Sequence, residues 1–476
     1  MLQPIGLIFL SLGAFSFYRR PELALGLLVT STVFGTAAAV NAGGSSLMVF
    51  HIAALVLGVR VALWAGIMGL IRPLVRTSAG VFLLLLFIYA ILSGYFMPRL
   101  FSGATNTVAI TEATSGIRVI QFLPLVPTGS NTTQSIYLIL GVGTFCSVAV
   151  CLRRTMDYGI MITLLSIAAG MHLVASLLDL LTYYTSTAAI LAPVRNADYA
   201  YLCGVEKGGL KRMCGFMSEA SSYATYTLVL FAIFVNLWID RIRTKITGLL
   251  AAGLFIGVMI STSGSGYVGF AIFMAALVIG RALRVFGGLP FRRAAELVIA
   301  LFLTICIAVF AIAMVPAISE TLSSFLEETV FGKLDSASGR ERTLWNQTAL
   351  QNFYDTNMLG AGLGSARASS IAVVLLAQVG IPGTALFVLH VASLLTGKLE
   401  AGLTREAQAL VTAARWAVVA HLIVAILVKG DFVFPLLFYI LSGTAAAGLM
   451  TFGTVSRERA LLAERRRLQA SEAVQG

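Results

Sequence analysis

Residues 79–97 read AGVFLLLLFIYAILSGYFM, a run without a charged side chain. An apolar run near 20 residues is long enough to cross the hydrocarbon core of a bilayer as an α-helix. Twelve further apolar runs can be placed along the chain, the two between 246 and 280 being short and joined by a tight turn; they lie at 2–17, 22–40, 47–70, 135–152, 158–184, 216–238, 246–261, 267–280, 295–318, 368–397, 409–428 and 432–452. The sequence therefore predicts an all-α polytopic integral membrane protein with about 13 transmembrane helices, within a range of about 12–14.

The composition points to the same class. The chain has 476 residues, of which 58% are hydrophobic and 11% charged, and its mean hydropathy is +0.91. These values exclude a soluble globular protein of ordinary composition. We expect a single transmembrane domain over 1–476 that ends in a cytoplasmic tail at 453–476.

The formal charge of +12 is distributed unevenly, and its placement argues against nucleic-acid binding. Basic residues concentrate in the connections after the first, third, fifth, seventh, ninth and eleventh runs and in the tail; examples are Arg19, Arg20, Arg72, Arg76, Arg153, Arg154, Arg241, Arg243, Arg281, Lys398 and Arg405. The positive-inside rule makes that face cytoplasmic. The N-terminus is then expected outside and the C-terminus inside, with the first run kept as a span because it lacks a basic n-region.

Three connections on the opposite side are long, at 98–134, 185–215 and 319–367. Functional residues tend to lie on long loops held by a rigid scaffold, so the working face is expected outside. No repeat of two halves is visible in the sequence, which weakens a transporter built from duplicated bundles.

The last of these loops contains the polar segment SGRERTLWNQTALQNFYDTNMLGAGLGS at 338–365. Ser338 and Glu341 fit a capping box, and apolar residues from Leu344 to Phe353 recur at helical spacing. We expect a short amphipathic helix here. Arg340 and Arg342 lie in its first turn, where two guanidinium groups beside free backbone N–H groups suit a phosphate or pyrophosphate.

A second polar segment precedes the run that starts at 216. Glu219 stands at the rim of this run, where a carboxylate is costly unless it faces a cavity or a partner. With Arg212 it offers a base for an incoming hydroxyl and a cation for a leaving group. The alternative is an interfacial carboxylate that pairs with Arg212 or Lys211.

Small and hydroxyl residues connect the two short runs at 261–267. Ser263 and Ser265 could donate hydrogen bonds to a phosphate or sugar. A tight helical hairpin with serine capping explains the same residues equally well.

The cysteines fall into two groups. Cys203 and Cys214 share the outer loop at 185–215, where a disulfide could pin the loop in an oxidising compartment. Two unpaired thiols are the alternative. The remaining cysteines lie in apolar runs and are expected to pack as small apolar residues.

Ionisable residues inside the apolar runs have few sequence neighbours to pair with. Arg60 and Asp179 are expected to pair with each other or to face a water-filled cavity, the structural pairing being favoured. The four histidines are expected to be hydrogen-bonded packing residues; they are His51, His172, His390 and His421. No ligand spacing for a metal ion is visible.

These segments together resemble a known family. Arg212, Gly215, Ser218 and Glu219 are similar to the pattern R-x-x-G-x-x-S-E-P-S of Wzy-type O-antigen and exopolysaccharide polymerases, with Ala220 where many members have proline. The late loop of that family is matched by Gly339-Arg340, Trp345, Gly360-Ala361-Gly362-Leu363-Gly364-Ser365 and Gly380-Ile381-Pro382-Gly383, and Ser263 matches its hairpin serine. The resemblance covers roughly 200 to 385 and extends to the O-antigen ligase-like superfamily.

The resemblance implies a GT-C-like, metal-independent glycosyltransferase without a cofactor, in the bacterial inner membrane. Such an enzyme joins polyprenyl-diphosphate-linked repeat units (undecaprenyl diphosphate carriers) into a polysaccharide on the periplasmic face. The implied catalytic residues are Glu219, Arg212 and Arg340, and the implied substrate-binding residues are Lys211, Arg342, Trp345, Ser263, Ser265 and Arg367. The implied partners are the lipid-linked glycan donor and acceptor, the lipid bilayer, and chain-length regulator or export proteins.

Two alternatives stay open from the residues. Ligases of the superfamily have a histidine shortly after the glycine-rich turn, whereas this chain has Arg367-Ala368-Ser369-Ser370 there. A polymerase is therefore favoured over a ligase-like transferase to another acceptor. The second alternative is a lipid-linked oligosaccharide flippase or secondary transporter, which should place its charge along a central cavity.

Overall fold

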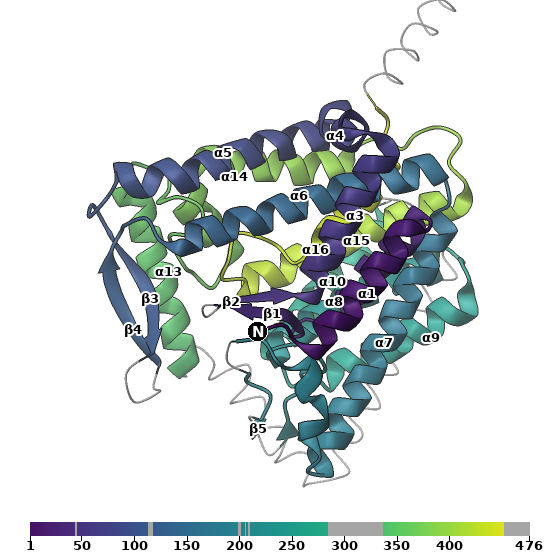
Figure 1. The fold of residues 1–476 in the computed structure, drawn as a ribbon, viewed down its shortest axis with the longest axis horizontal. Helices are drawn as coiled ribbons and strands as arrows, with labels where there is room; N and C mark the ends of the chain where they lie inside the picture. Colours follow the sequence, from purple (N-terminus) through teal and green to yellow (C-terminus); the bar gives the residue numbers. More distant parts are fainter. Residues whose placement is uncertain are drawn as a thin grey trace, which may run out of the picture.

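The computed structural model describes residues 1–42, 45–112, 118–198, 201–204, 206–207, 210–283 and 337–451, and this part of the chain is mostly helical (Figure 1). The first half contains α1 (Pro4–Tyr18), α2 (Pro21–Ser31), α3 (Val49–Ala65), α4 (Ile67–Arg76), α5 (Ser78–Leu100), α6 (Gly129–Thr155) and α7 (Tyr158–Tyr184). The second half contains the 3-10 helix η1 (Ala188–Val194), α8 (Ala220–Ile239), α9 (Thr244–Met259), α10 (Gly264–Ala282), α13 (Ala337–Asp355), α14 (Ile371–Thr396), α15 (Arg405–Val428) and α16 (Leu436–Ala447).

Seven of the described helices are long and apolar enough to cross a membrane, namely α5, α6, α7, α8, α10, α14 and α15. The bent pair α3 and α4 adds an eighth if it is counted as one span, and α1, α2, α9 and α16 are shorter apolar helices. The protein is thus a helical multi-pass membrane protein. The count of thirteen spans stays a prediction, and the expected span at 295–318 lies outside the described residues.

The apolar run at 47–70 does not form one continuous helix, although the bent pair α3 and α4 can still count as one span. Gly66 has φ +76° and ψ 157°, which no helix accommodates, and the chain turns by 99° between α3 and α4. Glycine tolerates this backbone conformation because it lacks a Cβ atom. α4 carries Arg72 and Arg76, and its amphipathic sequence suits a helix that lies across the end of the bundle.

The all-α expectation also misses three two-stranded antiparallel hairpins. They are β1 (Ala38–Ala42) with β2 (Ser45–Met48), β3 (Asn106–Glu112) with β4 (Arg118–Pro124), and β5 (Glu206–Lys207) with β6 (Leu210–Lys211). The apolar run 22–40 therefore does not continue as helix beyond Ser31. Its end becomes a strand that also receives a backbone hydrogen bond of 2.9 Å from Gln3 N–H to Ala39 O.

The connections segregate to two ends of the bundle. At one end, Arg153 lies 3.4 Å from Glu400, and Arg243 lies 3.6 Å from Glu406. At the other end, Asn131 Nδ2 donates to Leu363 O (2.6 Å), and Asn352 Nδ2 donates to Thr105 Oγ1 (2.8 Å). The arginine-rich connections thus meet at one end and the long loops at the other, while the assignment of these ends to cytoplasm and periplasm stays a prediction.

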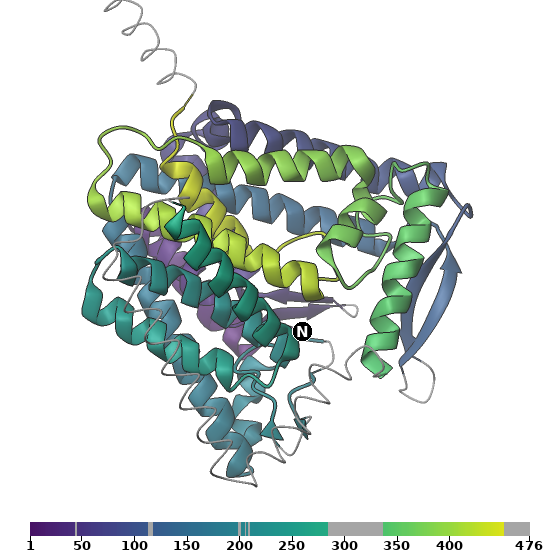
Figure 2. The same cartoon turned by 180° about the vertical axis from the view of Figure 1, so that it is seen from behind.

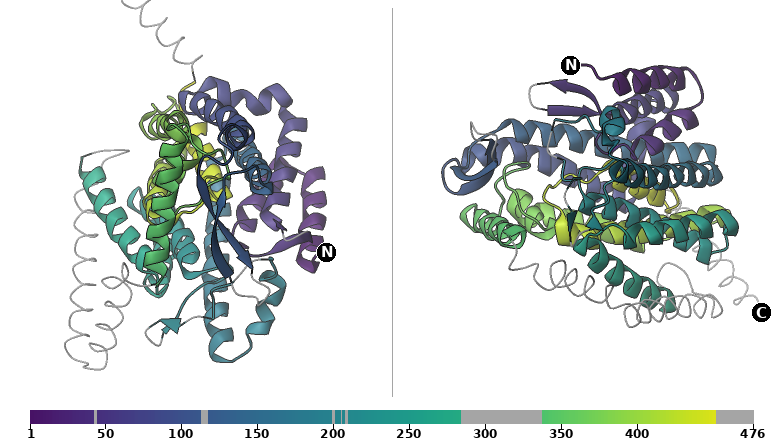
Figure 3. Two further views of the ribbon diagram at one scale, coloured as in Figure 1. Left: turned by 90° about the vertical axis from the view of Figure 1, so that its left-hand side faces the viewer. Right: turned by 90° about the horizontal axis from the view of Figure 1, so that it is seen from below.

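The helix expected in the late loop is present as α13. Its described residues are already helical at Ala337, so Ser338 lies inside the helix rather than at its N-cap. α13 packs against α14 and the β3–β4 hairpin, and it stands with that hairpin at one edge of the molecule (Figures 1 and 3). From behind, α13 is seen well apart from α8 and α10 (Figure 2).

Candidate functional site

Glu219 stands immediately before α8. Its backbone is extended, with φ −156° and ψ 163°, and its side chain makes no capping bond to the helix. Instead, one carboxylate oxygen accepts a hydrogen bond from the Ser221 hydroxyl. Neither Arg212 nor Lys211 forms an ion pair with Glu219, so within the described chain the interfacial pairing considered from the sequence is not made.

The Glu219 side chain lines a cavity of about 700 Å³ at the long-loop end of the bundle. The walls come from the segment after α2, the β1–β2 hairpin, the N-terminal parts of α3, α6, α8 and α16, the end of α15 and the connection from α15 to α16. Hydroxyl side chains contribute much of the polar lining; they are Thr32, Ser46, Ser218, Ser221, Ser222 and Thr225. Asp198 and Asp431 are exposed to solvent and also line this space, so the cavity is open at this end.

Aromatic rings form the apolar part of the wall. The His51 imidazole stacks on Tyr137 with ring centroids 4.6 Å apart, and the Tyr226 hydroxyl lies 2.8 Å from Thr32 Oγ1. His421 meets Phe434 edge to face at 5.5 Å. Aromatic faces beside carboxylates and hydroxyls provide both contact area and hydrogen-bond acceptors for a polyhydroxylated ligand.

The charge of the lining is unbalanced. Glu219, Asp198 and Asp431 contribute three carboxylates, and Lys429 is the one lysine or arginine among the lining residues that the structure describes. With neutral histidines the wall therefore carries more negative than positive charge.

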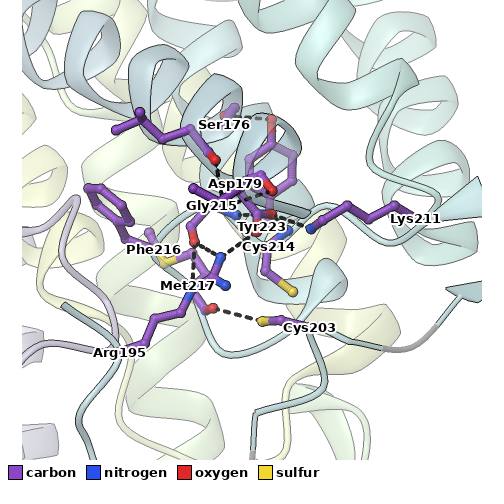
Figure 4. A network of polar contacts seen from close by, with 12 residues as sticks. Ser176, Asp179, Arg195, Cys203, Lys211, Cys214, Gly215, Phe216, Met217 and Tyr223 are labelled. Atoms are coloured by element: carbon purple, nitrogen blue, oxygen red, sulfur yellow. Dashed lines mark hydrogen bonds and ion pairs between the residues drawn. The ribbon is translucent and has the colours of Figure 1, made fainter. Parts of the chain in front are cut away.

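An ion-pair network at Asp179 holds the segment that leads to Glu219 (Figure 4). The Asp179 carboxylate lies 2.5 Å from Arg195 and 2.9 Å from Lys211, and it accepts backbone hydrogen bonds from Cys214 and Gly215 at 2.9 and 3.0 Å. A carboxylate buried this deeply is stable only when cations and donors satisfy it. Asp179 thus joins the end of α7 to three points of the following loop.

This network corrects the partner expected for Asp179. Arg60 does not pair with it, because the Arg60 guanidinium donates to Arg19 O (2.9 Å) at the arginine-rich end. The favoured structural role of Asp179 agrees with the closed network. Lys211, which the family resemblance makes a substrate-binding residue, is placed inside the protein, with its side chain only 3% exposed.

Cys203 and Cys214 are free, buried thiols in the structure, so the disulfide that the sequence permitted is not formed. The two thiols are nevertheless neighbours, since Cys214 Sγ approaches Leu202 O at 3.9 Å and Leu202 N–H donates to Ser218 O, which Cys203 Sγ also approaches. Each thiol perturbs the other, so that the pKa of Cys203 is lowered and that of Cys214 is raised. Cys203 also approaches Ser218 O at 3.4 Å, close to Glu219.

None of the other expected catalytic and substrate-binding residues lines the cavity that contains Glu219; they are Lys211, Arg212, Arg340, Arg342, Trp345, Arg367, Ser263 and Ser265. Arg340 and Arg367 are exposed to solvent. The Arg212 Nε and Trp345 Nε1 atoms are buried without a hydrogen-bond partner in the described chain. The expected pairing of one wall from α13 with another from Arg212 and Glu219 is therefore not seen, because α13 packs on α14 and β3 instead.

Ser263 acts as the N-cap of α10, accepting a hydrogen bond from Gly266 N–H at 3.3 Å. Its hydroxyl lies 3.2 Å from that of Ser265, and both side chains are buried. The contacts correspond to the helical hairpin with serine capping that the sequence allowed as the alternative to ligand binding.

The glycine-rich turn at 360–365 has a structural task. α14 breaks at Gly380, where φ is +59°. Ala361 N–H and Gly362 N–H donate to the carbonyl oxygens of Ala377 and Gln378, at 2.7 and 2.9 Å. The turn thereby satisfies backbone groups that the broken helix leaves without intrahelical partners, as a non-helical segment at membrane depth requires.

Lys429 and Asp431 escaped the sequence reasoning. They lie in the short connection between the apolar runs at 409–428 and 432–452, whereas the sequence predicts functional residues on the long connections. The sequence feature that could have identified them is the pair of opposite charges in Lys429-Gly430-Asp431. The connection is too short to place either residue far from the bundle.

The described residues contain no group of three or more His, Cys, Asp or Glu side chains arranged to hold a metal ion. A scan of the chain against models of known protein families found no match, and a search among curated proteins found none either.

Proposed function

We propose that this protein is a glycosyltransferase of the bacterial inner membrane that polymerises polyprenyl-diphosphate-linked oligosaccharide repeat units on the periplasmic face. The observation that carries the proposal is the position of Glu219 on the wall of a cavity of about 700 Å³ rich in hydroxyl and aromatic side chains. This volume is within the range of cavities that enclose small ligands. The motif resemblance supplies the reaction type.

In the proposed reaction, Glu219 accepts the proton of an acceptor sugar hydroxyl. The hydroxyl oxygen forms a bond to the anomeric carbon of the donor glycan, and the bond from that carbon to the phosphate oxygen breaks. The polyprenyl diphosphate leaves with the electron pair. Arg212 and Arg340 are the proposed electrostatic partners of the leaving group, although they would have to act outside the described cavity lining.

The carboxylate has an environment suited to this role. Ser221 donates a hydrogen bond to one oxygen, and no ion pair with a described residue consumes its charge. Its position before the first turn of α8 keeps the carboxylate near the positive end of the helix dipole. A Glu219 carboxylate oriented by Ser221 can therefore accept a proton without first breaking a salt bridge.

The test uses purified full-length protein and lipid-linked repeat units extracted from a strain that lacks this protein. Wild type should convert the single units into a ladder of polymers on a gel. Glu219→Gln keeps the shape but removes the base, so the rate should fall about 10²–10⁴-fold.

Glu406→Gln is the matched control, because this half-exposed carboxylate pairs with Arg243 at the arginine-rich end. It should keep the wild-type rate. A wild-type protein that forms no ladder would refute the polymerase proposal, and a Glu219→Gln rate within about twofold of wild type would refute the role of the base.

A flippase or secondary transporter is the second candidate, and the charged cavity lining is the observation that favours it. Arg60 and Asp179, the ionisable residues inside apolar runs, add no support to it, because Arg60 donates to Arg19 O and Asp179 is paired with Arg195. A deletion strain separates the two functions: single units accumulate outside when a polymerase is lost and inside when a flippase is lost. Transfer of preformed glycan to another acceptor by the purified protein would instead identify a ligase-like transferase.

A further inference from the structure

The connection between α15 and α16 places an ammonium group on the cavity wall. Lys429 directly follows α15, and its backbone N–H donates to Ala425 O at 3.0 Å, which continues the helical bonding by one residue. Its Nζ lies 5.7 Å from the centre of the Phe434 ring. The second contact places the ammonium group beside Phe434, which lines the same cavity.

The ammonium group forms no ion pair within the described chain, and Asp431 attracts it only from a longer distance. No carboxylate oxygen of those residues lies within 4.0 Å of Lys429 Nζ, although Asp431 is only two residues away. By contrast, Lys211 is closed into its pair with Asp179 at 2.9 Å. Lys429 is therefore the cation that the cavity offers to a ligand.

A purely structural role explains part of this arrangement. A lysine at the C-terminal end of a helix interacts favourably with the helix dipole. That role is fulfilled equally well by a side chain directed into solvent, and it does not account for an ammonium group held over Phe434 in the same cavity as Glu219. Partial burial also lowers the pKa of Lys429 by desolvation, a cost that an anionic ligand would relieve.

We infer that Lys429 binds an anionic oxygen of the substrate, either the carboxylate of an acidic sugar or a phosphate of the lipid carrier. The surrounding carboxylates of Glu219, Asp198 and Asp431 repel a doubly charged diphosphate more strongly than a singly charged sugar acid. The charge of the wall thus favours the acidic sugar. This inference rests on the proposed function for the identity of the substrate, but the anion site itself is tested separately.

The experiment measures binding to purified full-length protein by ligand-observed NMR, with glucuronate, pyrophosphate and neutral glucose as probes. Lys429→Met removes the charge at similar length, and Lys429→Arg keeps it. Lys398→Met is the matched control, because Lys398 is exposed at the arginine-rich end and no described carboxylate pairs with it. Thermal unfolding of each variant monitors folding.

We expect Lys429→Met to weaken glucuronate binding about tenfold or more, as loss of a charge-assisted contact does. Lys429→Arg should retain most of the affinity, and Lys398→Met all of it. Selective loss of pyrophosphate binding would assign Lys429 to the lipid carrier instead. Wild-type binding of neither anion, or equal binding by wild type and Lys429→Met, would overturn the inference. If Lys429→Met loses anion binding as expected but the wild-type protein forms no polymer, the anion site stands and only the proposed function is refuted.

Discussion

Replacing Asp179 with alanine should release the loop that leads to Glu219. The Asp179 side chain is 2% exposed and satisfies two cations and two backbone N–H groups. Removing one partner of a buried ion pair costs about 3–5 kcal/mol, because the remaining charges are left buried and unpaired. The free energies of the individual contacts are not additive. We therefore assign the range of about 3–5 kcal/mol to the loss of the whole Asp179 network.

The assay is the rate at which a maleimide modifies Cys214, followed by peptide mass spectrometry. Cys214 is fully buried, and its own N–H is one of the bonds lost. If modification requires local opening, a loss of about 3–5 kcal/mol raises the rate by roughly 150-fold to 4,000-fold, at 1.4 kcal/mol for each factor of ten.

Asp240→Asn provides the control for general destabilisation. Asp240 binds the buried Arg281 at 2.9 Å, but it lies at the arginine-rich end. This variant should lower thermal stability without exposing Cys214. Unchanged Cys214 labelling in Asp179→Ala would refute the reasoning that Asp179 holds the loop.

Three further predictions follow from particular contacts. Gly380→Ala should destabilise the protein by about 1–3 kcal/mol, measured by thermal unfolding, since its Cβ would lie 2.3 Å from Met358 O at a φ of +59°; an unchanged midpoint would contradict this. Mild oxidation should join Cys203 to Cys214, visible as a loss of two free thiols by mass spectrometry, because both thiols lie against the paired backbone of Leu202 and Ser218; persistence of both thiols would contradict it. The lowered pKa of Cys203 means that it ionises at lower pH than Cys214, so limiting iodoacetamide, applied while the pH is raised, should modify Cys203 first; equal modification at every pH would count against this order of ionisation.

The sequence is sufficient to predict the membrane class and several local elements. Apolar runs dominate the energetics of a lipid-embedded chain, so α5, α6 and α7 fall close to the runs at 79–97, 135–152 and 158–184. The helical spacing from Leu344 to Phe353 likewise leads to α13. Such features depend on neighbouring residues along the chain, and for that reason they can be read without tertiary information.

Contacts between distant segments could not be read in this way. The partners of Asp179 come from Arg195 and Lys211, in a loop whose path no periodicity defines. The bend at Gly66 and the β1–β2 hairpin likewise depend on a glycine conformation and strand pairing that hydropathy does not encode.

The candidate site was predicted in part. The unusual position of a carboxylate at the start of an apolar run identified Glu219, and the structure places it on a cavity. Lys429 was missed because its importance arises from the approach of α15 to α8, more than 200 residues earlier in the chain.

The cavity is assembled from stretches that extend from Thr32 to Leu437. A fragment that contains all of its walls must therefore extend at least from Thr32 to Leu437. A gene truncated after residue 404 would still encode six of the seven long apolar helices and Glu219, yet it would lack α15, α16 and Lys429. Such a product could insert into a membrane, but its cavity would be incomplete. Membrane insertion of a shortened variant is therefore a poor measure of its ligand binding or activity.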